Sequence, residues 1–194
     1  DRRQEPEPIK KTASEERLSA SSIKTPRELA QQYAAYIAQL RESKIELGWP
    51  DIDSRIRGIT AGEVMTIMAK CRGGKTALLQ NILLNIGRRA TSTTLFLSME
   101  QPGHQVFERY AQMGCGQKGS YIERSWQESE QPVQAIIESV AADLGDRTLT
   151  CDEAGLKPSD IEQVIPMAEE RLGRKLNLVA IDYLGLIDGH DMDR

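Results

Sequence analysis

The chain has 194 residues, of which 39% are hydrophobic, so it is long enough for one domain with its own core and a tail. A formal net charge of −4 argues against a surface built as a whole to attract phosphate backbones, although a local basic groove remains compatible with it. No apolar run approaches the roughly 18–20 residues of a membrane span, and the polar amino end argues against a signal peptide. Three cysteines without a CxxC pair and two distant histidines predict neither zinc nor disulfides, so we expect a cytoplasmic protein without a membrane partner.

The amino-terminal part of the chain differs in composition from the rest. Residues 1–24 are rich in Glu, Lys, Arg, Ser and Pro and lack a sustained apolar period, which is typical of a disordered tail or an interdomain linker. The chain starts at Asp1 without a methionine, so we expect it to be a piece of a longer protein.

A helix is predicted over residues 25–44. Thr25 is a good N-cap, Pro26 suits the first helical position, and Glu28 completes a capping box. A narrow apolar stripe follows, formed by Leu29, Tyr33, Ile37 and Leu40. Two interpretations stay open: the stripe packs on the helix's own domain, or it docks on a neighbouring subunit.

From residue 63 onward, strand patterns alternate with helix patterns. Strands are predicted over residues 63–68, 93–98, 147–151 and 176–181, and helices over 76–86, 103–113, 131–143 and 158–172. Such alternation favours an α/β fold with a mainly parallel sheet covered by helices on both faces.

The strongest motif lies between the first predicted strand and the first helix after it. It matches the P-loop pattern G-x-x-x-x-G-K-[ST] except at its first position, and it comprises Ala69, Lys70, Cys71, Arg72, Gly73, Gly74, Lys75 and Thr76. The two glycines let backbone N–H groups point at phosphate oxygens, and the following helix adds its positive end. Lys75 is expected to reach the β- and γ-phosphates and Thr76 to bind Mg²⁺. The alternative is a chance G-G-K-T, which the flanking strand and helix make less favourable.

Two acidic residues follow predicted strands. Asp182 ends the last strand, where α/β sheets bind ligands, and is placed to hold Mg²⁺ through water; the alternative is a solvated strand-end acid. Glu100 follows the strand after the P-loop helix, where a carboxylate can orient and deprotonate an attacking water. Its alternative is an acid favoured by the helix dipole.

Together these segments resemble the ATPase domain of DnaB-type replicative helicases, a branch of the RecA-like superfamily. The resemblance rests on L-G-W-P-D-I-D-S-R-I-R-G-I-T-A-G-E-V over residues 47–64, S-M-E-Q-P over 98–102 and I-D-Y-L-G-L-I over 181–187. It covers about residues 46–188, and the family's P-loops also commonly begin with Ala, as at Ala69.

The resemblance implies an ATP- and Mg²⁺-dependent motor. It assigns phosphate and magnesium binding to Lys75 and Thr76, the general base to Glu100 and the Walker B acid to Asp182. It also identifies the first helix as a linker that docks on the next subunit of a hexameric ring, and residues 45–194 as a RecA-like domain. Implied partners are single-stranded DNA, further copies of the chain, and a primase or loader protein.

The chain departs from the family pattern in two places. Gly185 stands where the family usually has Gln, and the sequence stops at Arg194. The family continues with further strands, a sensor Gln, DNA-binding loops and an arginine finger, so we expect an incomplete domain that is nearly inactive alone.

Three functions remain open at this stage. The first is a motor that hydrolyses ATP as a ring on single-stranded DNA. The second is a RecA-like regulatory or recombination-associated module that uses ATP to assemble rather than to translocate. The third is a nucleotide-binding fragment without its own activity.

Overall fold

The structure is a computed structural model that describes residues 23–90, 92–128 and 131–183. Most of the expected tail, residues 1–22, and Gly185 lie outside these residues. Contacts between Cα atoms divide the chain into one unit that ends at Glu42 and a second that begins at Ser43.

The described part of the first unit is built around helix α1 (Pro26–Ser43). The predicted capping box is present, because the Thr25 backbone N–H and hydroxyl both donate to the Glu28 carboxylate, at 2.7 and 2.8 Å. These hydrogen bonds, led by the one from the Thr25 backbone, hold the pKa of Glu28 below its ordinary value. Along the helix, the side chains of the apolar stripe are exposed at Leu29 (50%), Tyr33 (62%) and Ile37 (41%).

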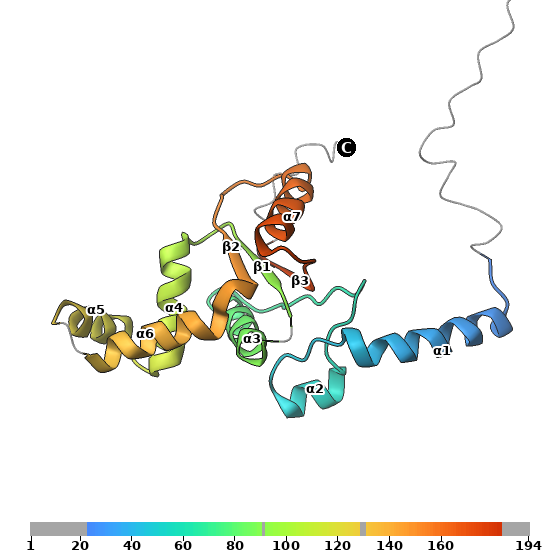
Figure 1. Cartoon of the computed structure of the whole chain (residues 1–194), viewed down its shortest axis with the longest axis horizontal. Coiled ribbons are helices and arrows are strands. Elements are labelled where there is room, and N and C mark those ends of the chain that lie inside the picture. The colour runs from blue at the N-terminus through green and yellow to red at the C-terminus, as the bar shows by residue number, and fades with distance from the viewer. Residues whose placement is uncertain (1–22, 91, 129–130, 184–194) are drawn as a thin grey trace, which may run out of the picture. The chain divides into compact units, whose positions relative to one another are not determined.

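The second unit alternates helices and strands, as predicted (Figure 1). Its elements are α2 (Pro50–Ile56), α3 (Lys75–Arg89), β1 (Thr94–Ser98), α4 (Gly103–Cys115), α5 (Gly119–Gln127), α6 (Gln131–Leu144), the 3₁₀ turn η2 (Gly145–Arg147), β2 (Thr148–Cys151), α7 (Pro158–Leu172) and β3 (Leu178–Asp182). The short helices α2 and α5 were not predicted, since neither is long enough to show a clear apolar period. Within the described ranges, no helix combines the length and apolarity required to cross a bilayer.

The strands form one sheet in the order β2-β1-β3, and both pairings are parallel. In the register of this sheet Thr94 lies beside Thr148 and Leu178, and Ser98 lies beside Asp182. The prediction of a parallel sheet is therefore confirmed. Because all strands run the same way, the residues after Ser98, Cys151 and Asp182 meet at one edge.

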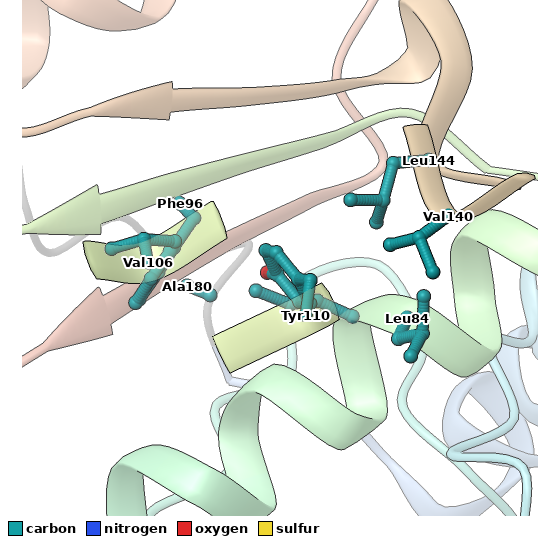
Figure 2. Packing of buried hydrophobic residues seen from close by; sticks show 8 residues of the cluster. Leu84, Phe96, Val106, Tyr110, Val140, Leu144 and Ala180 are labelled. Carbon is teal, nitrogen blue, oxygen red and sulfur yellow. The ribbon is translucent and has the colours of Figure 1, made fainter. Parts of the chain in front are cut away.

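Side chains of β1 alternate between two apolar layers. Phe96 faces α3, α4 and α6, where it packs in a cluster with Leu83, Leu84, Val106, Tyr110, Val140, Leu144 and Ala180 (Figure 2). Leu95 and Leu97 face the opposite side and pack with Ala168 and its neighbours on α7. The sheet is thus covered on both faces, as predicted from the near-continuous apolar strands.

The prediction that residues 63–68 form a strand of this sheet is wrong. The segment keeps the side-chain alternation of a strand, because Val64 and Met68 are 90% and 87% exposed whereas Met65 and Ile67 pack on an inner cluster. No described segment pairs with it, and a cavity of about 260 Å³ lies between it and β3. Strand propensity is local, but a strand forms only where a partner supplies hydrogen bonds.

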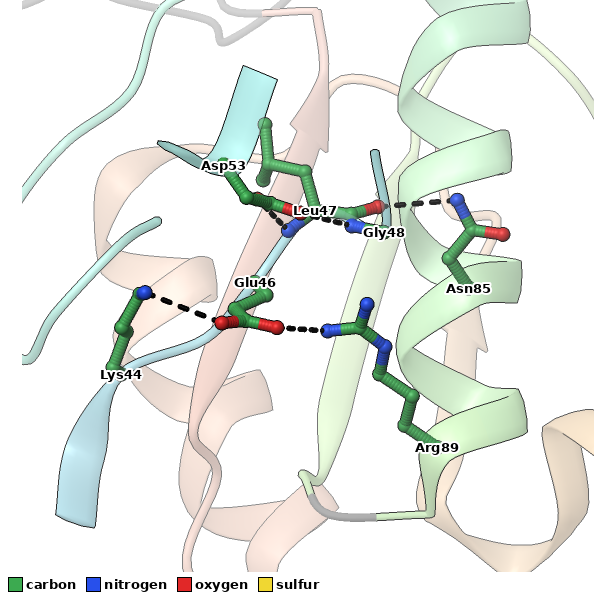
Figure 3. Close-up of polar contacts among 7 residues, drawn as sticks. All are labelled: Lys44, Glu46, Leu47, Gly48, Asp53, Asn85 and Arg89. Carbon is green, nitrogen blue, oxygen red and sulfur yellow. Dashed lines mark hydrogen bonds and ion pairs between the residues drawn. The ribbon is translucent and has the colours of Figure 1, made fainter. Parts of the chain in front are cut away.

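Residues 44–60, which we call the α2 platform, pack on one side of α3 (Figure 3). The buried carboxylate of Asp53 accepts hydrogen bonds from the backbone N–H groups of Leu47 (2.6 Å) and Gly48 (2.9 Å). Asn85 of α3 donates to the Leu47 carbonyl at 3.1 Å.

An ion pair joins the same two segments. Arg89 of α3 lies 2.6 Å from Glu46, which also pairs with Lys44 at 3.2 Å (Figure 3). The hydrogen bonds from Lys44 and then Arg89 lower the pKa of the Glu46 carboxyl. The α2 platform therefore contacts the helix that follows the P-loop.

Candidate nucleotide-binding site

The P-loop folds back on itself just before α3. Arg72 and Gly74 have left-handed backbone conformations (φ 60° and 81°), and the Gly73 N–H donates to the Lys70 carbonyl at 2.9 Å. A Cβ atom at Gly73 would lie 2.8 Å from the Lys70 oxygen and 2.9 Å from the Ala69 Cβ. The tight turn therefore requires glycine at this position, which is the role that the sequence motif predicts for it.

The end of α3 that meets the loop carries no group that competes with an anion. Its N-cap residue is Gly74, which makes no side-chain capping bond, and its first turn contains no acidic residue. The N–H groups of this turn and the positive end of the helix dipole are therefore available to phosphate. The six loop residues from Ala69 to Gly74 are exposed to solvent.

Lys75 and Asp182 line one cavity of about 410 Å³, although they come from distant parts of the sequence. The Lys75 ammonium group donates to the Ala69 carbonyl at 3.3 Å, so the side chain bends back over the loop. The remaining lining is mainly apolar and consists of Thr66, Ile67, Met68, Ala69, Leu79 and Tyr183. The cavity thus combines an apolar wall with one cation and one acid, as small-molecule sites often do.

The position of Asp182 is suited to binding a metal cation. Its side chain belongs to a residue that is only 5% exposed, and among the described residues no group donates a hydrogen bond to its carboxylate. Because Asp182 lines the cavity, its carboxylate offers the kind of oxygen ligand that a hard cation such as Mg²⁺ prefers. Thr76 is half-buried in the first turn of α3. A hydroxyl and a carboxylate are each oxygen ligands that Mg²⁺ accepts beside several waters and phosphate oxygens.

Glu100 lies at the same edge of the sheet but does not line this cavity, and neither does Thr76. Glu100 is exposed in the bend between β1 and α4, two residues beyond Ser98. Since Ser98 pairs with Asp182, the bend that carries Glu100 starts next to the strand end that carries Asp182.

Two polar residues around this bend were missed in the sequence. The Ser98 hydroxyl donates to the Gln101 carbonyl at 2.7 Å, and the Asp152 carboxylate accepts from the Gly103 N–H at 2.6 Å. Asp152 follows the end of β2 just as Asp182 ends β3, so the strand-end rule applied to Asp182 could have drawn attention to it. For Ser98, a serine inside an apolar strand was the only signal.

Clusters of at least three His, Cys, Asp or Glu side chains that could hold a metal do not occur among residues 23–90, 92–128 and 131–183.

The fold and the loop define the chain first as a P-loop protein of the RecA-like class. Its structure is similar to a solved structure described as an ATPase domain, with a TM-score of 0.70 and 16% sequence identity over 89% of this chain and 62% of that one. The chain belongs to the DnaB-like helicase C-terminal domain family, whose model matches residues 44–194. The predictions of fold class and family are both confirmed.

Similar proteins with a curated description are also helicases by that description. A probable plasmid replicative DNA helicase of Chlamydia muridarum (strain MoPn / Nigg) is 28% identical over 141 residues, which is 73% of this chain and 31% of the relative. A protein of the same description from Chlamydia psittaci is 28% identical over 148 residues, or 72% of this chain and 30% of the relative. The chain thus spans about a third of the length of these relatives.

Proposed function

We propose that the chain is the ATP-binding motor part of a hexameric replicative DNA helicase. The observation that carries the proposal is the shared cavity of Lys75 and Asp182, which joins the P-loop to the end of β3. Family membership supports it, since the matched model describes a helicase domain. We take residues 1–24 as a tail or linker, 25–44 as a linker helix and 45–194 as an incomplete ATPase domain.

In this proposal the loop binds the phosphates of ATP. The backbone N–H groups of residues 69–76 and the start of α3 cradle the phosphate oxygens, and Lys75 exchanges its bond to the Ala69 carbonyl for the β- and γ-phosphates. Thr76 and Asp182 would hold Mg²⁺. The chemistry that this ion would supply is neutralisation of the phosphate charge.

Glu100 is the proposed general base. An exposed carboxylate at the same sheet edge as Asp182 can accept a proton from the water that attacks the terminal phosphate. An arginine finger from a neighbouring subunit is typically worth about 10³–10⁵ in rate, so the chain alone is expected to turn over very slowly.

The proposed partners are other copies of the chain, single-stranded DNA, and a primase or loader protein in the cytoplasm. Support for a ring comes from α1, whose apolar side chains Leu29, Tyr33 and Ile37 are exposed and suited to docking on a neighbouring copy.

DNA-stimulated ATP turnover by the intact protein tests this function. A motor should hydrolyse ATP faster with single-stranded DNA and unwind a forked duplex, and Lys75→Ala should abolish both. Binding of ATP without DNA stimulation or unwinding would instead indicate the regulatory or recombination-associated module.

A further inference from the structure

Helix α4 starts three residues after Glu100 and lacks a cap of its own. Its N-cap residue is Pro102, which has no side-chain acceptor, and its first turn contains no acidic residue. The first N–H groups of a helix have no partner inside the helix and need one from elsewhere. The start of α4 therefore depends on a group from another element.

Asp152, just beyond β2, supplies that group. Its Oδ2 atom accepts a hydrogen bond from the Gly103 N–H at 2.6 Å, across 49 residues of sequence. A Cβ atom at Gly103 would lie 3.1 Å from the same oxygen, so glycine allows the carboxylate to approach closely. The bond also places a negative charge at the positive end of the helix.

Glu100 thus lies in a short bend whose two ends are both held. On the β1 side, the Met99 N–H donates to the Asp182 carbonyl at 3.1 Å, and the buried Ser98 hydroxyl donates to the Gln101 carbonyl at 2.7 Å. On the α4 side, the bond to Asp152 at Gly103 is the side-chain contact that fixes the backbone. Loss of that contact removes this side-chain hydrogen bond at the α4 end of the bend, and the start of α4 is then held by the packing of Val106 in the core cluster.

We propose that Asp152 is a positioning residue that holds Glu100 in place for the attack of water on ATP. The proposal rests on the proposed role of Glu100 as general base. Asp152 acts through the backbone of α4, and it does not line the cavity of Lys75 and Asp182. A displacement of about 1 Å in a catalytic group can cost up to about 10²-fold in rate, so the effect falls on turnover rather than on binding.

The test compares Asp152→Ala with Asp152→Asn in the intact protein. Asp152→Ala should lower kcat about tenfold while the Kd for Mg-ATP changes less than about twofold. Asp152→Asn keeps an oxygen that accepts from the Gly103 N–H, and Asn is as good a cap as Asp, so this variant should restore kcat to within about threefold of the original.

Asp160→Ala is the matched control. Asp160 accepts a bond of the same kind, from the Lys157 N–H at 2.8 Å, at the start of α7. This variant loses a comparable cap, yet its kcat should stay unchanged. Equal losses of kcat in Asp152→Ala and Asp160→Ala would overturn the proposal, because general destabilisation would then explain both.

A double-mutant cycle with Glu100→Gln separates this proposal from the function on which it rests. If Asp152 acts through Glu100, Asp152→Ala should lower the single-turnover rate less than about twofold further in the Glu100→Gln background. Multiplicative losses would overturn the positioning role while leaving the base in place. Unchanged turnover in Glu100→Gln alone would overturn the base, and the positioning role with it.

Discussion

Position, rather than charge alone, distinguishes Lys75 from the other cations of the P-loop. Lys70 and Arg72 are exposed to solvent, whereas Lys75 lines the cavity that contains Asp182. The left-handed backbone conformations of Arg72 and Gly74 form the turn that precedes Lys75. The proposed role of Lys75 therefore depends on the turn and not on the basic character of the loop.

Replacement of the single residue Glu100 by Gln tests its proposed role as general base. The amide keeps the size of the side chain but cannot accept a proton from water, so turnover by the intact protein should fall about 10²–10⁴-fold. The affinity for Mg-ATP should stay nearly the same, because Glu100 does not line the cavity of Lys75.

Glu123→Gln provides the control for this substitution. Glu123 is an exposed glutamate on α5, so the same chemical change there should leave both turnover and affinity intact. Turnover of Glu100→Gln equal to that of Glu123→Gln would identify Glu100 as a helix-end acid.

Helix α3 links the structural elements of the second unit. Its first residue, Lys75, lines the cavity that contains Asp182, and Leu83 and Leu84 pack beneath the sheet. Ile82 and Ile86 pack on the α2 platform, which is further joined to α3 through Asn85 and Arg89. Contacts on opposite sides of α3 therefore fix the direction from which the helix meets the loop of residues 69–76.

Asp53→Ala tests how much the α2 platform contributes to stability. The change leaves the Leu47 and Gly48 N–H groups without their acceptor in a buried region. Unsatisfied buried groups cost about 1–3 kcal/mol each, and we expect a loss of about 2 kcal/mol in the free energy of unfolding. Urea denaturation of the two proteins measures this difference.

Asp51→Ala is the control on the same helix. Asp51 is exposed in the first turn of α2, so its loss removes only a favourable dipole interaction and should cost less than about 1 kcal/mol. Equal losses in both variants would mean that the buried bonds of Asp53 do not hold the platform.

The sequence predicted those elements whose signals are local. Long apolar periods located α3, α4, α6 and α7, and the G-G-K-T motif located the turn before α3. The prediction of a strand at residues 63–68 was wrong because strand pairing needs a partner strand, which the strand propensity of a segment does not reveal. Asp152 was missed for a related reason, since its bond to Gly103 spans 49 residues and depends on the order of β2 and β1 in the sheet.

At the scale of the whole molecule, the proposed ring depends on the exposed stripe of α1. Tyr33→Asp places a charge in the middle of that stripe, where burial against another copy would require its desolvation. We expect assembly in the presence of Mg-ATP to weaken by about tenfold or more. Analytical ultracentrifugation of the intact protein measures the effect.

Gln31→Asp is the control for assembly. Gln31 lies on the opposite side of α1 and is exposed, so the same charge there should leave assembly unchanged. Full assembly of Tyr33→Asp would show that the stripe does not contact a neighbouring copy.

Calorimetric titration of residues 1–194 with a non-hydrolysable Mg-ATP analogue tests most directly whether the chain is a P-loop nucleotide-binding domain. The chain and its Lys118→Ala variant, which loses an exposed lysine at the start of α5, should bind one nucleotide with equal affinity. Lys75→Ala should bind about 10–100-fold more weakly or not measurably, since a charge-assisted bond is worth about 1.5–3 kcal/mol. Equal affinity of Lys75→Ala and the unaltered chain would contradict the account.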